Sequence, residues 1–449
     1  MSVPAKKSTT MRHGKLPQGV VVAAPGSAAP AAALPAKPST VAPARSAAFH
    51  ILHKVATTAA HSDDMLHTPA VDALSHEDRN LTTALVLGVL RWQLQLDTVL
   101  RPMLQRPDAE LHPAARLALR MGAFQLLHME RVPAHAVLND SVELARSNGA
   151  PHAAGMVNAL LRRLLREQAA PARTRIAEAM SPAERAHPEW LIARWRANFG
   201  GVTARRIAEY DQHEPPANGL FTDHDDVRQM DDGSRLIAEL AAACVTAPLR
   251  ILDCCAAPGG KTAMLARRHP NAHIVAADVN EKRLNAMSKR LARDPATADV
   301  QCLIVDMTMP PGGAAFTQPF DLILCDAPCS GTGTLARNPE IRHRLRGSDL
   351  ARQAERQTAI LNTALQLLSP QGRLVYATCS LEPEENEGVV NAVLANGYVQ
   401  IATGNLVAGL TTLKEGALRD VMTGDALRTI PGTQACDGFY AAVLQRRPV

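Results

Sequence analysis

The sequence predicts an α/β protein in which an all-α helical domain precedes a doubly wound α/β domain. Three observations lead to this prediction. After about residue 248, short apolar runs alternate with helical stretches, as in a parallel sheet covered by helices. Between residues 46 and 170, apolar residues recur with a helical period and no strand signals intervene. The length of 449 residues suits two to four domains.

The first 45 residues are rich in Ala, Pro and Ser, with scattered Lys and Arg, and the first acidic residue of the chain is Asp63. Such a segment cannot bury enough apolar surface to offset its chain entropy, so we expect a disordered basic tail. The alternative, an organellar transit peptide, fits the shortage of acidic residues. It does not fit the many prolines, which would break an amphipathic helix.

The segment 46–170 is expected to form a bundle of about five helices. One helical stripe consists of Leu81, Leu85, Val89 and Trp92. Ser75 followed by Asp78 is a typical helix start. Three further stretches follow Pro113, Pro133 and Pro151, each at a first-turn position. The end of this segment carries three arginines, Arg162, Arg163 and Arg166. They form either a solvated helix face or a ridge that contacts phosphates.

Residues 171–247 are interpreted as a connecting subdomain, with a helix over Glu189–Phe199 and a loop over 213–219. The α/β domain occupies 248–449. Its expected strands are Leu249–Asp253, His273–Ala277, Val300–Val305, Phe320–Cys325 and Arg373–Ala377, separated by helical stretches such as Glu281–Ala292 and Asp349–Leu368. The third and fourth runs are almost continuously apolar, which predicts strands buried on both faces.

Composition narrows the possible functions. The net charge is +5, and residues 1–210 hold 25 Lys and Arg against 16 Asp and Glu, so the basic excess lies in the first half. This distribution suits a module facing a polyanion, joined to one that binds a small molecule. Aromatic residues make up 3%, too few for a broad base-stacking platform. No apolar run approaches the roughly 18 residues of a membrane span.

The eight cysteines all lie beyond residue 243 and form no C-x-x-C pair. Their placement argues against a disulfide scaffold or a zinc site and favours a reducing compartment, so we expect no metal and a cytoplasmic location.

The first strand of the α/β domain runs into a loop with the glycine pair Gly259-Gly260. A phosphate-binding loop would need glycine at the position of Cys255, and the dinucleotide fingerprint would need a third glycine. Both motifs are therefore absent. The pair either forms a plain tight turn or lets a ligand approach the start of the following helix.

Two aspartates follow the next two strands. Asp278 stands where a carboxylate can accept both hydroxyls of a ribose, and Asp306 where it can receive an adenine amino group. Either could instead be a helix N-cap. Their occurrence on adjacent strands favours a cofactor that contains a nucleoside.

Two cysteines follow the fourth and fifth strands, at the edge where ligands bind. Cys329 lies in a turn that begins at Asp326, and Cys379 lies between Thr378 and Ser380. A lone cysteine is most often a small buried hydrophobe, but two at this edge suggest chemistry. Carbon 5 of cytosine is a poor nucleophile. Addition of a thiolate at carbon 6 makes it enamine-like and able to attack an activated methyl group, and a nearby carboxyl group would stabilise the developing charge.

Three motifs, CAAPGGKT at Cys255–Thr262, DAPCSGTG at Asp326–Gly333 and TCS at Thr378–Ser380, resemble those of the S-adenosylmethionine-dependent RNA (cytosine-5) methyltransferases. The helical region resembles the NusB-like domain of the bacterial RsmB branch, notably in Val132–Asn139 and Val157–Arg163. The terminal Asp437–Tyr440 matches as well. The resemblance covers roughly residues 45–447 and implies a Rossmann-like catalytic domain acting on 16S ribosomal RNA at cytosine 967.

The resemblance also implies roles for individual residues. S-adenosylmethionine would be bound by Cys255, Ala256, Ala257, Pro258, Gly259, Gly260, Lys261, Asp278, Asp306 and Asp326. Cys379 corresponds to the nucleophile and Cys329 to a second cysteine that assists release of the methylated base. The residues alone do not rank the two thiols, because DNA cytosine methyltransferases use a cysteine that follows a proline, as Cys329 does.

Two departures leave the target open. Phe221-Thr222-Asp223 replaces an Arg-Val-Asn-like segment, and the stretch from there to Asp253 is about forty residues shorter than in RsmB chains. That stretch belongs to a small RNA-binding subdomain. His343 also stands where the family tends to have tryptophan. The expected partner is RNA, with no membrane, and the chain is expected to be a monomer. The alternatives are a catalytically silent RNA-binding paralogue and the same chemistry on another RNA, such as a transfer RNA.

Overall fold

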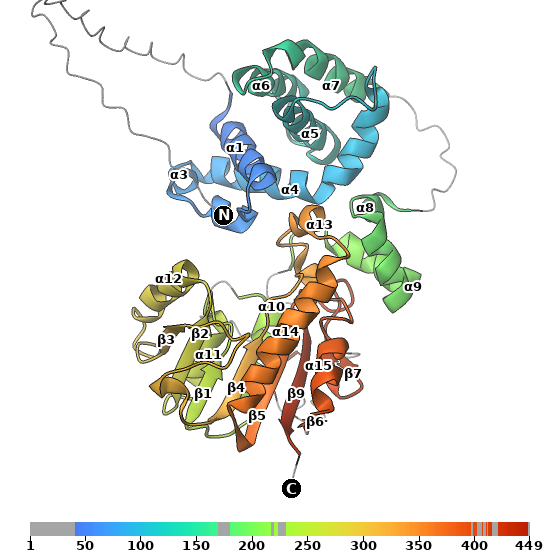
Figure 1. Ribbon diagram of the computed structural model, residues 1–449. Helices are drawn as coiled ribbons and strands as arrows, with labels where there is room; N and C mark the ends of the chain where they lie inside the picture. The colour runs from blue at the N-terminus through green and yellow to red at the C-terminus, as the bar shows by residue number, and fades with distance from the viewer. Residues whose placement is uncertain are drawn as a thin grey trace, which may run out of the picture. The chain divides into compact units, whose positions relative to one another are not determined.

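The computed structural model describes residues 41–168, 180–216, 220–222, 230–396, 398–401, 406, 410, 412–414 and 421–447 (Figure 1). These residues belong to one compact unit that spans positions 40–449. The tail predicted for residues 1–45 lies outside the described residues up to position 40. No helix in the described ranges is long and apolar enough to cross a membrane.

The first part of the chain is helical throughout. Its helices are α1 (Pro43–Thr57), α2 (Ser62–Leu66), α3 (Pro69–Asp72), α4 (His76–Leu100), α5 (Pro113–His128), α6 (Ala134–Ser147) and α7 (Ala154–Gln168), with 3-10 turns η1 (Arg101–Met103) and η2 (Pro151–Ala153). The predicted start of α4 is confirmed, because the Ser75 side chain accepts a hydrogen bond from the backbone nitrogen of Asp78 at 3.1 Å.

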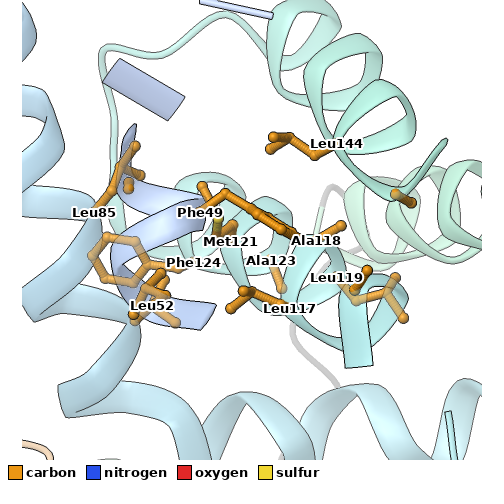
Figure 2. Close-up of a cluster of buried hydrophobic side chains, with 14 of the residues drawn as sticks. Phe49, Leu52, Leu85, Leu117, Ala118, Leu119, Met121, Ala123, Phe124 and Leu144 are labelled. Atoms are coloured by element: carbon orange, nitrogen blue, oxygen red, sulfur yellow. The ribbon is translucent and has the colours of Figure 1, made fainter. Parts of the chain in front are cut away.

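These helices pack around a single apolar core (Figure 2). The predicted stripe of α4 faces it, with Leu85 and Val89 fully buried and Leu81 and Trp92 half-buried against it. Phe124 of α5 fills the space over Gly88, where any side chain would collide with its ring.

The tail was predicted to extend to residue 45, which is three residues too far. Helix α1 begins at Pro43, so residues 43–45 belong to the helical domain. Arg45 is buried, donates to Oε1 of Gln125 at 2.7 Å and pairs with Oδ2 of Asp140 at 3.0 Å. Composition missed this start because alanine and proline serve both a loose tail and a well-packed first helical turn.

Three helices connect the helical domain to the sheet: α8 (Pro182–Arg185), α9 (Glu189–Tyr210) and α10 (Asp232–Ala243). Helix α9 continues the predicted Glu189–Phe199 helix past a kink at Gly200, whose φ is 81°. Helix α10 was not predicted. Its buried face, including Leu236 and Leu240, packs against the sheet, so this part of the 171–247 segment is integrated into the α/β layers.

The α/β domain contains one mixed sheet. Its strands are β1 (Arg250–Asp253), β2 (His273–Asp278), β3 (Gln301–Ile304), β4 (Phe320–Asp326), β5 (Leu368–Thr378), β6 (Tyr398–Ile401), β7 (Met422–Thr423), β8 (Ala426–Arg428) and β9 (Tyr440–Arg446). Among the described residues the order is β3-β2-β1-β4-β5-β9-β8-β7, and β6 also pairs with β9. The strands β1 to β5 pair in parallel, and β9 runs antiparallel to β5.

All five predicted strands are present, but the third differs from its prediction. Strand β3 lies at the edge of the sheet, and its burial is incomplete, with Ile304 55% exposed. An apolar run of this length does not distinguish an edge strand from a central one. Strand β4 is central and buried as predicted. The strands β6 to β9 were not predicted.

Helices cover both faces of the sheet (Figure 1). One face is covered by α14 (Asp349–Gln366) and α15 (Glu387–Leu394), the other by α10 and α11 (Gly260–Arg268). Four more described elements belong to this domain: α12 (Glu281–Leu291), which packs against β2, the short helix α13 (Ile341–Arg344) and the turns η3 (Ala314–Phe316) and η4 (Thr332–Thr334). The strand order reverses between β1 and β4, which makes their carboxyl ends the expected ligand site.

Candidate functional site

A cavity of about 1030 Å³ opens at the carboxyl ends of β1 and β4. Eight of the predicted cofactor residues line it: Cys255, Ala256, Ala257, Pro258, Gly259, Gly260, Lys261 and Asp326. Other parts of the wall come from Asp231, Arg337 and the α2 residues Asp63, Asp64 and His67. The loop after β1 therefore forms one continuous wall, as predicted from its position in the sheet.

Gly259 is required by the backbone of this loop. Its φ is 96°, in the left-handed region, and it caps α11. A Cβ atom there would lie 2.6 Å from Cγ of Met287 on α12. The tight-turn interpretation is therefore correct for Gly259. It does not conflict with ligand binding, because the same turn exposes the start of α11 to the cavity.

Asp253 is a cavity residue that the sequence analysis did not select. It ends β1 and is 2% exposed, and Oδ2 accepts a hydrogen bond from Thr262 at 2.6 Å. Its other oxygen, Oδ1, is buried and has no partner among the described residues. Burial raises the pKa of Asp253 to about 7. An unpaired buried acceptor at the cavity wall suits a ligand that brings a hydrogen-bond donor or a positive charge.

The two aspartates predicted for the nucleoside differ in position. Asp278 is buried beside the loop, where Oδ2 accepts from the backbone nitrogen of Ala257 at 3.0 Å and Oδ1 from that of Asn280 at 2.8 Å. The N-cap of α12 is Asn280 and not Asp278. Asp306 is exposed, and neither Asp278 nor Asp306 is among the residues that line the cavity. The backbone nitrogen and the hydroxyl of Thr308 donate to it and lower its pKa.

Lys261 and Asp326 form an ion pair inside the site. The Nζ atom of Lys261 lies 2.8 Å from Oδ2 of Asp326 and 5.5 Å from the centre of the Phe439 ring. Burial alone would lower the pKa of Lys261, but Asp326 and, further, the sulfur of Cys379 more than compensate and raise it. The site therefore holds a permanent ammonium group close to Cys379.

The side chains of the two candidate cysteines are in contact. Fifty positions apart in the chain, Cys329 and Cys379 have their Sγ atoms 3.3 Å apart at the ends of the neighbouring strands β4 and β5. Both thiols are free. The hydrogen bond with Cys379 and burial raise the pKa of Cys329 well above its ordinary value. The sequence analysis named these two thiols as candidates, and the structure brings their sulfurs into contact.

The terminal Asp437–Tyr440 segment packs against these loops. The backbone nitrogen of Gly333 donates to the carbonyl of Cys379 at 2.9 Å, and that of Gly438 donates to the carbonyl of Gly333 at 2.8 Å. Arg337 binds Asp437 through Nε at 2.9 Å and Asp231 through Nη2 at 3.0 Å. Burial, together with the charge of Asp231, raises the pKa of Asp437 to about 8. Only the resemblance drew attention to this segment, because its residues lie far from the motifs in the sequence.

The stretch after η4 docks on the helical domain through buried polar groups. Nε of Arg91 on α4 donates to the carbonyl of Ala336 at 3.1 Å, and Glu340 accepts from the hydroxyl of Ser62 at 2.7 Å. Arg342 is 1% exposed and donates to the carbonyl of Arg91 at 3.0 Å. His343 donates through Nε2 to the carbonyl of Leu90 at 2.7 Å, and burial lowers its pKa to about 3. Residues 336–343, which follow the Cys329 turn in the sequence, are thus fixed to the helical domain.

Comparison with known proteins gives matches over both parts of the chain. Residues 246–445 match a family model described as 16S rRNA methyltransferase RsmB/F, and residues 42–166 match the NusB family. A protein from Xanthomonas campestris pv. campestris named ribosomal RNA small subunit methyltransferase B is 32% identical over 420 residues, which are 82% of this chain and 89% of that protein.

A protein of the same name from Vibrio cholerae is 30% identical over 90% of this chain and 97% of its own length. Among solved structures, the crystal structure of PH0851 superposes with a TM-score of 0.64 at 19% identity, covering 91% of this chain and 99% of that one. At that identity the structural match shows the shared fold.

Proposed function

The chain belongs to the RsmB/F family of 16S rRNA methyltransferases, and from this premise we propose that it methylates carbon 5 of a cytosine in 16S ribosomal RNA, cytosine 967, through a covalent bond between a cysteine and the base. Family membership makes the chain an enzyme that methylates ribosomal RNA with S-adenosylmethionine. The proposal adds the atom that is methylated, the position in the RNA and the covalent intermediate.

The observation that carries the proposal is the 3.3 Å contact between the sulfurs of Cys329 and Cys379 at the ends of β4 and β5, where β4 also ends in Asp326, the partner of Lys261. The two cysteines are not among the residues that line the cavity. Methylation of an exocyclic amine or a ribose hydroxyl needs no thiol. Methylation at carbon 5 of a pyrimidine does, because the ring must first be activated by addition of a nucleophile at carbon 6.

The cavity fits the methyl donor. Gly259 and Gly260 leave room at the start of α11, and the unpartnered Oδ1 of Asp253 can accept a hydrogen bond from an ammonium group. We assign the cofactor to Cys255–Lys261, Asp278 and Asp326, with Asp306 at the outer, adenine side. When bound, S-adenosylmethionine supplies an electrophilic methyl group.

Cys379 is assigned as the nucleophile. Its sulfur adds to carbon 6 of the cytosine, and this sulfur is among the groups that raise the pKa of Lys261. Asp326 holds that lysine in place from the end of β4. Addition makes carbon 5 electron-rich, so that it would take the methyl group and leave S-adenosylhomocysteine. The proton on carbon 5 would then pass to water, the electron pair of that C–H bond would restore the double bond between carbons 5 and 6, and the bond between carbon 6 and sulfur would break to free the thiolate of Cys379.

Cys329 is assigned to the release step. It keeps its proton in the free enzyme and lies at hydrogen-bond distance from the sulfur of Cys379. Its S–H group can therefore donate a hydrogen bond to the sulfur of Cys379 as that sulfur leaves the base as a thiolate. A departing group that is stabilised in this way leaves faster.

We assign RNA binding to the helical domain, predicted as residues 46–170 and extended back to Pro43 by the structure, and to the connecting segment, 171–247, and catalysis to 248–449. The basic excess of the first half supports this division. Helix α10 contributes to the catalytic layers as well. We propose that the chain acts as a monomer in the cytoplasm, since its substrate is ribosomal RNA and its motifs come from one chain.

Bisulfite sequencing of total RNA from cells with and without the gene tests the proposal. The expected result is loss of a single mark at cytosine 967 of 16S ribosomal RNA. If the mark is lost from a transfer RNA instead, the proposed reaction stands and the proposed substrate is wrong. The short stretch between Thr222 and Asp253 would be consistent with that result. No lost mark in any RNA would reject the enzymatic proposal and leave a silent RNA-binding paralogue.

A further inference from the structure

One buried carboxylate links the two cysteine loops. Glu385 is fully buried and lies in the segment between β5 and α15. On the Cys329 side it accepts from the backbone nitrogen of Ser330 at 2.8 Å and from the hydroxyl of the same serine. On the Cys379 side it accepts from the hydroxyl of Ser380 at 2.5 Å. The residues that follow the two cysteines are therefore held by the same side chain.

A third element completes this arrangement. Gln357 of α14 donates through Nε2 both to Oε1 of Glu385 and to the carbonyl of Pro328, each at 3.0 Å. Pro328 immediately precedes Cys329, so the cysteine is held on both sides. The phenol of Tyr376 on β5 donates to the backbone carbonyl of Glu385 at 2.6 Å and fixes the glutamate itself.

The pattern of donors suits a carboxylate at this position. Four N–H and O–H groups converge on the two oxygens of Glu385, and a carboxylate can accept them all. Glutamine would put an amide N–H₂ group against one of these donors and leave it unpaired. The charge also acts on chemistry, because Glu385 is among the groups that raise the pKa of Cys329.

We propose that Glu385 is a positioning residue for the cysteine pair, which sets the distance between the sulfurs of Cys329 and Cys379 by binding Ser330 and Ser380 at once. It touches neither the base nor the methyl donor, and it acts through the two loops. This inference rests on the proposed function for its catalytic consequence, whereas the spacing of the sulfurs can be measured without any RNA.

The test compares Glu385→Gln with Glu384→Gln in the full chain. Glu384 is the adjacent residue, is exposed and pairs with Arg194, so the control makes the same chemical change at the surface. The probe for sulfur spacing is phenylarsine oxide, which bonds to two neighbouring thiols and releases one water. Its capture by Cys329 and Cys379 is followed by peptide mass spectrometry, with cofactor binding measured by calorimetry to confirm folding.

We expect Glu385→Gln to bind the cofactor within about threefold of wild type, to capture the arsenical at least about tenfold more slowly, and to lose at least about tenfold in kcat with little change in KM for RNA. Glu384→Gln should match wild type in all three. Arsenical capture by Glu385→Gln at the wild-type rate would overturn the proposal. If wild type captures the arsenical but methylates no RNA, the proposed function fails and the positioning role stands.

A second variant covers the case in which Glu385→Gln does not fold. Ser380→Ala removes the hydroxyl that donates to Glu385 from the Cys379 side and leaves the carboxylate in place. It should slow arsenical capture in the same direction as Glu385→Gln. Wild-type capture by a folded Ser380→Ala variant would contradict the inference, because that hydroxyl is the contact by which Glu385 holds the Cys379 side.

Discussion

The sulfur of Cys329 lies 3.3 Å from the sulfur of Cys379, and the two thiols have different surroundings. Buried Glu385 is among the groups that raise the pKa of Cys329, whereas Cys379 is among the groups that raise the pKa of Lys261. Under the function proposed above, this difference would let one thiol attack the base while the other assists its release.

Replacement of Cys379 by alanine is expected to abolish methyl transfer while leaving cofactor binding nearly intact. The sulfur is needed only to activate the base. The loop assigned to the cofactor follows β1, whereas Cys379 follows β5, so the substitution leaves that loop unchanged. Turnover is measured with tritiated S-adenosylmethionine on unmodified 16S ribosomal RNA, and cofactor affinity by calorimetry. Undiminished turnover would refute the nucleophile assignment.

Replacement of Cys329 by serine is expected to trap a covalent complex between the protein and RNA. A serine hydroxyl is smaller and a weaker acid, so it supports the departing sulfur of Cys379 less well. The complex should appear as a shifted band on a denaturing gel, and the band should vanish in the double variant Cys329→Ser/Cys379→Ala. Normal turnover without such a band would count against the release role.

Much of this site could be predicted because it is built from strand ends. Each motif follows an apolar run, and parallel strands bring their carboxyl ends to one edge, so Lys261, Asp326 and Cys379 had to converge once the five strands were identified. The family resemblance is confirmed by the matches over both parts of the chain. The helical bundle was likewise predictable from its period, and its NusB-like character followed from the resemblance, which the family match confirms.

Other features depended on contacts that no local pattern encodes. Glu385 lies in a segment rich in glutamate, where nothing distinguishes it from Glu382 or Glu384 until the buried serines are seen around it. The edge position of β3 depends on strand order and not on its own sequence. Helix α10 sits in a stretch interrupted by loops, and its packing partner is a sheet that begins later in the chain.

Replacement of Gly259 by alanine is expected to weaken cofactor binding at least about tenfold. The residue has a φ of 96°, and a Cβ atom would lie 2.6 Å from Cγ of Met287, so the loop after β1 must move. Gly312→Ala is the matched control, since no atom lies within 4 Å of the position its Cβ would take. Calorimetric titration with S-adenosylmethionine measures both. Equal affinity in the two variants would mean that the turn does not shape the cofactor site.

Replacement of His343 by glutamine is expected to make the chain less sensitive to acid. Burial lowers the pKa of His343 from about 6.5 in the unfolded chain to about 3 in the folded chain. Above pH 6.5 the ring is neutral in both states, and folding is not opposed by protonation. Stability is lost as the pH falls from 6.5 towards 3, because the unfolded chain binds the proton first. Between pH 7 and pH 5 the loss amounts to about 2 kcal/mol.

Glutamine can still donate to the carbonyl of Leu90 but does not titrate, so the contact with α4 survives without its dependence on pH. Urea unfolding of wild type and His343→Gln at pH 7 and pH 5 measures the difference, with exposed His67→Gln as control. The free energy of unfolding should fall less in His343→Gln than in the other two. His187 is also buried with a lowered pKa, so some acid sensitivity should remain in every variant. An identical fall in all three proteins would show that protonation of His343 does not limit the stability of the contact between the two domains.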